Sequence, residues 1–168
     1  EISGFDISIV SEFDVGGGFL TADLRANFND HKIKKIQRDS VTPSDVFDFE
    51  NQVPDNRVTL TLDYRTDSWF GGYVRFNHYG GWGDSGGQVG PSDASEAIDY
   101  GSAILVDIEA NFQINDYLRV SVGGDNVFDT FPDEDGHFVS GLLGIKYSLT
   151  SPFGFNGAFW YARLTADF

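Results

Sequence analysis

The sequence of 168 residues contains 26 acidic and 11 basic side chains, which gives a formal net charge of −15. This excess of negative charge argues against DNA or RNA as a partner, because neutralising phosphates requires a basic face. The absence of cysteine excludes disulfide frameworks, thiolate metal sites and cysteine nucleophiles, and no apolar run is long enough for a transmembrane helix.

Apolar and polar residues alternate with a period of two in segments of about ten residues, which predicts about seven β-strands with one apolar and one polar face. In chain order, the predicted strands are residues 5–13, 20–28, 58–65, 70–79, 104–113, 118–123 and 160–168. The fifth strand has an apolar set that we expect to face lipid or apolar surroundings: Ile104, Val106, Ile108, Ala110 and Phe112. Its polar set, which we expect to face a wet interior, includes Asp107, Glu109 and Asn111.

The links between the predicted strands alternate between short and long. Short links cover residues 14–18, 66–68 and 114–116, and long polar links cover residues 30–55, 81–101 and 129–154. Outer-membrane barrels show this asymmetry, with tight periplasmic turns and long outer loops, and about eleven tilted residues span their apolar band of roughly 25 Å. A soluble β-sandwich also has alternating strands, but they are shorter and its links have no reason to segregate. We therefore predict an all-β fold of antiparallel, up-and-down transmembrane β-barrel strands in the bacterial outer membrane.

The direction of the last predicted strand places Phe168 on the short-turn, periplasmic side, and counting back through the strands places Glu1 outside. A complete barrel has both ends inside and an even number of strands. We therefore expect residues 1–168 to be the C-terminal part of a larger barrel domain, with an open sheet in sequence order. An alternative makes residues 137–147 an eighth strand of a small stand-alone barrel, but Gly141, Gly144 and a weak polar face favour a long loop there.

Two motifs late in the chain resemble those of TonB-dependent receptor barrels. Asn126-Val-Phe-Asp129, directly after a predicted strand, is similar to the N-L-F-D element of that family, and residues 151–168 (SPFGFNGAFWYARLTADF) look like its terminal strand. The resemblance implies a receptor that takes up a scarce nutrient chelate, such as a siderophore, with energy supplied through TonB. It also implies an N-terminal plug domain, which is absent from this sequence, so contact with TonB is expected through that missing region.

The resemblance also assigns roles to residues at the ends of the predicted strands. Ligand contact is expected on the extracellular side, where the candidates are Tyr79, Trp82, Asp84, Phe131 and Phe153. Aromatic residues near both sets of strand ends suggest interfacial girdles. The outward face of the last strand is expected to signal to the barrel-assembly machinery through Trp160, Leu164 and Phe168.

The sequence has a single basic cluster, which follows a strand that we expect to emerge on the outer side. Its members are Lys32, Lys34, Lys35 and Arg38. These cations either meet lipopolysaccharide phosphates or balance local charge, and the pattern favours neither interpretation.

No catalytic or metal-binding pattern is present. His31, His78 and His137 lie far apart without the spacing of a metal site, and no Gly-x-Ser-x-Gly element occurs. We therefore predict neither an enzyme nor a metal or other cofactor. Besides the receptor, two hypotheses stay open at this point: a small outer-membrane barrel with a structural or adhesive role, and a secreted β-sandwich binding module.

Overall fold

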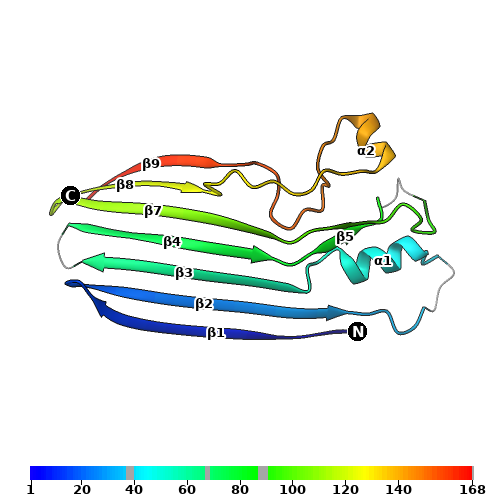
Figure 1. The fold of residues 1–168 in the computed structure, drawn as a ribbon, viewed down its shortest axis with the longest axis horizontal. Helices are drawn as coiled ribbons and strands as arrows, with labels where there is room; N and C mark the ends of the chain where they lie inside the picture. The colour runs from blue at the N-terminus through cyan, green and yellow to red at the C-terminus, as the bar shows by residue number, and fades with distance from the viewer. Residues whose placement is uncertain (37–39, 67–68, 87–90, 168) are drawn as a thin grey trace.

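The computed structural model describes all residues except 37–39, 67–68, 87–90 and 168. Seven long antiparallel strands form one sheet in the order β1-β2-β3-β4-β7-β8-β9 (Figure 1). Their bounds are β1 Ile2–Val15, β2 Gly18–His31, β3 Asn56–Thr66, β4 Phe70–Tyr79, β7 Ala103–Asn115, β8 Leu118–Asp125 and β9 Phe159–Ala166. The predicted all-β class, number of long strands and up-and-down order are confirmed, although most strands extend beyond the predicted limits.

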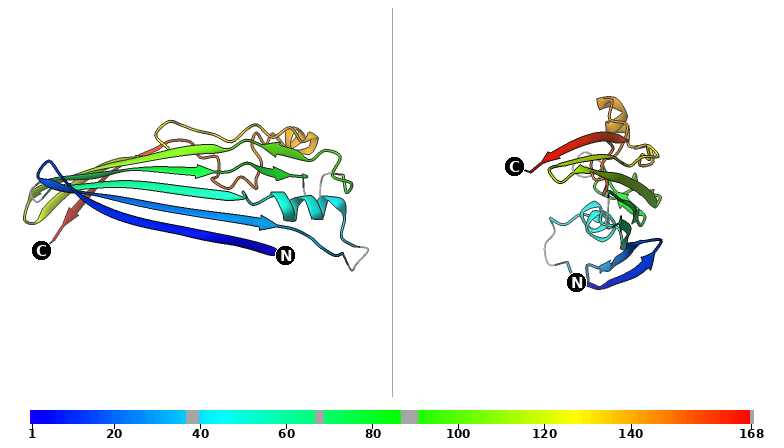
Figure 2. Two further views of the ribbon diagram at one scale, coloured as in Figure 1. Left: turned by 60° about the horizontal axis from the view of Figure 1, so that its bottom comes forward. Right: turned by 90° about the vertical axis from the view of Figure 1, so that its left-hand side faces the viewer.

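The long links all lie at one end of the sheet, opposite the short turns (Figure 2). They contain small elements that the sequence analysis did not predict: α1 (Pro43–Asn51), α2 (Phe138–Leu143) and a two-stranded sheet of β5 (Trp82–Asp84) and β6 (Ile98–Tyr100). We call these links, residues 32–55, 80–102 and 126–158, the loop layer, and the seven long strands the strand wall. The predicted segregation of short and long links is confirmed.

The first helix of the loop layer has a complete N-terminal cap. Thr42 accepts from the backbone N–H of Asp45, while the Asp45 carboxylate accepts from the backbone N–H of Thr42, and Pro43 occupies the first turn. This reciprocal pair is the capping box, which satisfies N–H groups that a helix start leaves free. The capping residues Thr42 and Asp45 can be found in the sequence. The helix was not predicted because its nine residues, inside a long polar link, show little apolar periodicity.

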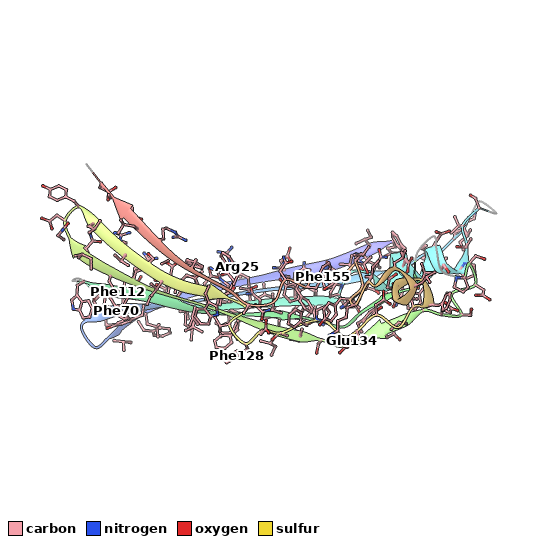
Figure 3. All side chains as sticks on the ribbon, turned by 90° about the horizontal axis from the view of Figure 1, so that it is seen from above. Arg25, Phe70, Phe112, Phe128, Glu134 and Phe155 are labelled. Carbon is pink, nitrogen blue, oxygen red and sulfur yellow. The ribbon has the colours of Figure 1, made fainter. Side chains whose placement is uncertain are left out.

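The strand wall is curved, so it has a concave and a convex face. Figure 3 shows Arg25 on the concave side and Phe70, Phe112 and Phe128 on the convex side. Because neighbouring residues of a strand point to opposite faces, the even-numbered apolar set of β7 lies on the convex face with Phe112, and Asp107, Glu109 and Asn111 lie on the concave face. The predicted division of this strand into two faces is confirmed.

Large apolar side chains on the convex face are exposed. Phe5, Ile9, Ile104 and Leu164 are 60%, 52%, 54% and 68% exposed, respectively. Among the described residues, the large buried apolar side chains are only Tyr79, Trp82, Tyr100 and Val106. No second sheet covers the described part of the wall, as a sandwich would require, so the sandwich hypothesis is wrong for this fold.

Residues 137–147 form α2 and a turn, and they do not extend the sheet. Gly144 ends the helix with φ 70°, a left-handed conformation that glycine adopts without strain. One isolated bridge pairs Glu134 with Tyr147. The loop interpretation of this segment is therefore confirmed and the eighth strand is not formed.

The outer edges of β1 and β9 pair with no other strand among the described residues, as predicted for an open sheet. Neither described helix combines the length and the apolar character needed to cross a membrane.

Candidate functional site

Polar side chains of the concave face bond to one another across the strands. Representative pairs are Asn27 Nδ2 to Asp6 Oδ1 at 2.7 Å, Asn77 Nδ2 to Asp107 Oδ2 at 2.8 Å, and Ser121 Oγ to Asn111 Oδ1 at 2.5 Å. Such cross-strand pairs join the neighbouring strands through the polar side chains of this face. The concave face is therefore an ordered polar surface.

The carboxylate of Glu109 joins β7 to β9 across β8. Tyr161 Oη donates to Glu109 Oε2 at 2.6 Å, and Arg163 Nη2 lies 3.6 Å from the same oxygen. Gly123 lies between them in the register, and a Cβ there would come within 2.7 Å of the Tyr161 hydroxyl. The tyrosine ring therefore lies across a position where a larger residue would displace it.

Four arginines line a hollow of about 640 Å³ on the concave face: Arg65, Arg75, Arg119 and Arg163. We call this hollow the arginine basin. All six lysine or arginine side chains in the long strands are arginines at odd positions, which form the concave set of every long strand except β1: Arg25, Arg57, Arg65, Arg75, Arg119 and Arg163. The sequence alternation shows this parity, but it does not show which arginines meet around one hollow.

The loop layer is held together by carboxylates that accept hydrogen bonds from hydroxyl and backbone donors. Asp84, 7% exposed, accepts from Ser148 Oγ at 2.6 Å and from Thr150 Oγ1 at 2.9 Å. Asp48 on α1 accepts from the backbone N–H and the hydroxyl of Ser85 at 2.7 and 2.8 Å. These contacts tie the second long link to both the third and the first.

A third carboxylate, Asp135, lies at the contact between β6 and α2. Its Oδ1 accepts from Tyr100 Oη at 3.1 Å and lies 2.5 Å from His137 Nδ1, and its Oδ2 accepts from Ser140 Oγ at 2.5 Å. Burial acts to raise the pKa of Asp135, but the hydrogen bonds from Ser140 and His137 outweigh it and hold this pKa below its ordinary value. Burial and the neighbouring carboxylate raise the pKa of Tyr100.

The five predicted ligand-contact residues all lie in or beside the loop layer, but most are covered. Tyr79, Trp82 and Asp84 are 9%, 4% and 7% exposed, respectively. Trp82 stacks on Tyr100 with 4.2 Å between ring centroids, and Tyr79 lies 5.3 Å from the ring of Phe153. Phe131 is 40% exposed and stacks on Tyr147. The first three would reach a ligand only if the layer opened, and ligand contact at these positions stays a prediction.

The predicted basic cluster lies at the start of the loop layer, and its described lysines Lys32, Lys34 and Lys35 are exposed. Lys34 pairs with Glu1, and Lys32 Nζ lies 3.5 Å from Asp30 Oδ1. Arg38 is outside the described residues. Contact with lipopolysaccharide stays a prediction.

On β9, Trp160 and Leu164 share the convex face and are 61% and 68% exposed. Phe168 is outside the described residues, so the assembly signal that includes it stays a prediction. Near the short turns, Trp69 and Phe70 lie 5.8 Å apart, and Phe70 lies 5.6 Å from Phe112 on the neighbouring strand. This aromatic cluster is where an interfacial girdle would lie.

Sequence reasoning missed the carboxylates that join the loops, Asp48 and Asp135. Neither stands in a motif, and their partners are 37 and 35 residues away in sequence. Among the described residues, no group of three or more histidine, aspartate and glutamate side chains comes together to hold a metal ion.

In a comparison with protein families, residues 1–127 match the model described as TonB dependent receptor-like, beta-barrel. The matched range runs from β1 through β8 and ends within Asn126-Val-Phe-Asp129. No curated protein and no solved structure matches the chain.

Proposed function

Because the chain belongs to the TonB-dependent receptor-like β-barrel family, we propose that it forms the C-terminal wall of an outer-membrane receptor for active uptake of a scarce nutrient chelate, such as a siderophore. The concave face would line the lumen, the convex face would contact lipid, and the loop layer would lie outside the cell. The chain would supply no catalytic group.

The observation that carries this proposal is the opposite character of the two faces of one sheet. Large apolar side chains such as Ile104 and Leu164 are more than half exposed on the convex face, while the concave face is joined by polar cross-strand bonds. In water this arrangement would expose a large apolar surface, whereas a barrel with a wet lumen requires it.

The open edges of β1 and β9 support a larger barrel. Unpaired N–H and C=O groups are not tolerated in hydrocarbon, so further strands must close the sheet. We place the plug domain and the contact with TonB outside this chain. The exposed Lys32, Lys34 and Lys35 would contact lipopolysaccharide. The barrel-assembly machinery would recognise the convex residues of β9.

Uptake measurements in the source bacterium test the proposal. Deleting the complete receptor should abolish energised uptake of one nutrient in a panel of labelled iron chelates, cobalamin and oligosaccharides, and deleting TonB should have the same effect. Restoring the receptor gene should restore uptake only in cells that have TonB. Unchanged uptake of every nutrient in the receptor deletion, or restoration without TonB, would contradict the proposal.

A further inference from the structure

The polar and apolar side chains of α2 lie on opposite sides of this short helix. At about 100° per residue, His137 at the helix start and Ser140 share one side, while Phe138, Leu142 and Leu143 lie on the other. The polar side packs on the loop layer, whereas Phe138, Leu142 and Leu143 are 75%, 74% and 66% exposed. A surface helix of a water-soluble domain has the reverse arrangement, with its apolar side turned inward.

Hydrogen bonds to Asp135 hold α2 in this orientation. The Asp135 carboxylate accepts from the backbone N–H of His137 at 3.0 Å and from Ser140 Oγ at 2.5 Å. Tyr100 Oη donates to the same carboxylate at 3.1 Å, and the backbone N–H of Asp135 donates to the carbonyl of Lys146 at 2.9 Å. The helix therefore cannot turn its apolar side toward the loop layer without breaking these bonds.

The helix lies on the side of the molecule where the sheet is open. Figures 1 and 2 both show α2 at the β9 side of the loop layer, far from β1. Among the described residues the outer edge of β9 is unpaired, and β9 begins at Phe159 beside the loop layer and runs toward the short turns. An antiparallel strand on that edge runs the other way and ends at the loop layer. Its outer link therefore begins on the same side as α2.

We propose that the apolar side of α2 packs against the outer link of the barrel strand that pairs with the free edge of β9. This inference rests on the part of the proposed function that closes the sheet into a barrel, and it names the contact that covers the closure outside the membrane. The link would present apolar side chains to Phe138, Leu142 and Leu143, and burial of these side chains would stabilise the contact.

The charge around α2 favours a protein segment over a lipopolysaccharide surface. The third long link has four carboxylates and a single lysine: Asp129, Asp133, Glu134, Asp135 and Lys146. Lys146 Nζ lies 3.1 Å from Glu134 Oε1, so this cation is already paired. An acidic surrounding repels the phosphates of lipopolysaccharide, whereas an apolar protein segment needs no opposite charge.

Cysteine labelling of the complete receptor tests the proposal, because residues 1–168 contain no cysteine. Any cysteine elsewhere in the receptor is replaced by serine. Leu142→Cys and the control Ser95→Cys in the second long link are labelled with a water-soluble maleimide, both in intact cells and after purification in detergent. The described residues leave both positions exposed. Leu142→Cys should nevertheless react at least about tenfold more slowly than Ser95→Cys in both settings, because the outer link covers it.

A second variant identifies what covers the helix. Replacing the outer link of the strand that pairs with β9 by a short Gly-Ser turn should raise the labelling rate of Leu142→Cys to that of Ser95→Cys. The rate of Ser95→Cys should not change. Folding is checked by heat-dependent migration on gels, and Leu143→Cys gives a second measurement if Leu142→Cys fails to fold.

Equal labelling rates of Leu142→Cys and Ser95→Cys in the receptor with its link intact would overturn the proposal. Protection that disappears on purification would also overturn it and would assign the cover to a separate protein or to the membrane. Protection that persists after the link is replaced would overturn it as well. Rapid labelling in a receptor with TonB-dependent uptake would remove only this inference, whereas protection without any TonB-dependent uptake would support the contact and remove the proposed function.

Discussion

In the strand wall, large apolar side chains lie outside, with Ile104 54% and Leu164 68% exposed, whereas in the loop layer Trp82 and Tyr100 are each 4% exposed. The wall is stabilised by backbone pairing and by polar bonds on one face. The loop layer has its own small aromatic core, surrounded by carboxylates that accept from hydroxyl groups. The described part of the wall thus leaves its apolar face uncovered, as a barrel surrounded by lipid would, while the loop layer buries its aromatic residues by itself.

The comparison can be tested most strongly by placing the same charge on the two faces of β7. Ile108→Arg on the convex face should destabilise the complete barrel in lipid vesicles by about 2–4 kcal/mol, because the guanidinium would face hydrocarbon. Leu105→Arg, on the concave face of the same strand, should change stability by only about 0.5 kcal/mol. Denaturant unfolding measures both, and equal losses would mean that the convex face does not contact lipid.

In the loop layer the largest effect is expected at Asp84. Asp84→Ala removes the acceptor of the buried Ser148 hydroxyl and of Thr150, and it should cost about 3 kcal/mol of loop stability. The effect should be local: hydrogen exchange of the third long link should accelerate, while β7 stays protected. The control Asp93→Ala removes an exposed carboxylate that accepts from the backbone N–H of Ser95 in the same link, and it should leave exchange nearly unchanged. Equal acceleration in both variants would show that Asp84 does not join the links.

The strand wall was predictable because apolar and polar residues alternate along each of its strands. Neighbouring positions alone show that Ile108 and Glu109 lie on opposite faces of the strand. The pairing registers between strands then follow from the short turns that join them. The loop layer was not predictable in the same way, since Asp84 meets Ser148 across 64 residues without a motif. From sequence alone, polar residues such as Asp135 are expected to face solvent. In the loop layer the Asp135 side chain is instead buried, because its carboxylate accepts several hydrogen bonds.

Within the wall, Gly123 tests how closely side chains pack across the concave face. Gly123→Ala would place a Cβ 2.7 Å from the Tyr161 hydroxyl and should displace the ring from Glu109, at a cost of about 2 kcal/mol in unfolding free energy. Tyr161→Phe keeps the ring and loses only the hydrogen bond, so it should cost less. Gly141→Ala is the control in the loop layer, because nothing lies within 4 Å of a Cβ there. An unchanged unfolding free energy in Gly123→Ala would show that the Tyr161 ring does not depend on the space above Gly123.

The smallest effect that we expect is an acid-induced loosening of the loop layer at Asp135. The hydrogen bonds from Ser140 and His137 hold the folded pKa of Asp135 below its ordinary value, so its contribution to stability is complete above an unfolded pKa of about 3.9 and is lost as pH falls through the lower folded pKa. The layer should therefore stay closed from neutral pH to about pH 4 and loosen below it. Emission from Trp82, which stacks on Tyr100, reports the change once Trp69 and Trp160 are replaced by Phe. The Asp135→Asn variant should lose this acid transition, because its amide does not titrate. A red shift of the Trp82 emission that begins above pH 5, or one that persists in Asp135→Asn, would assign the transition to another titrating group. The closed state of the loop layer would then depend on contacts other than those of the Asp135 carboxylate.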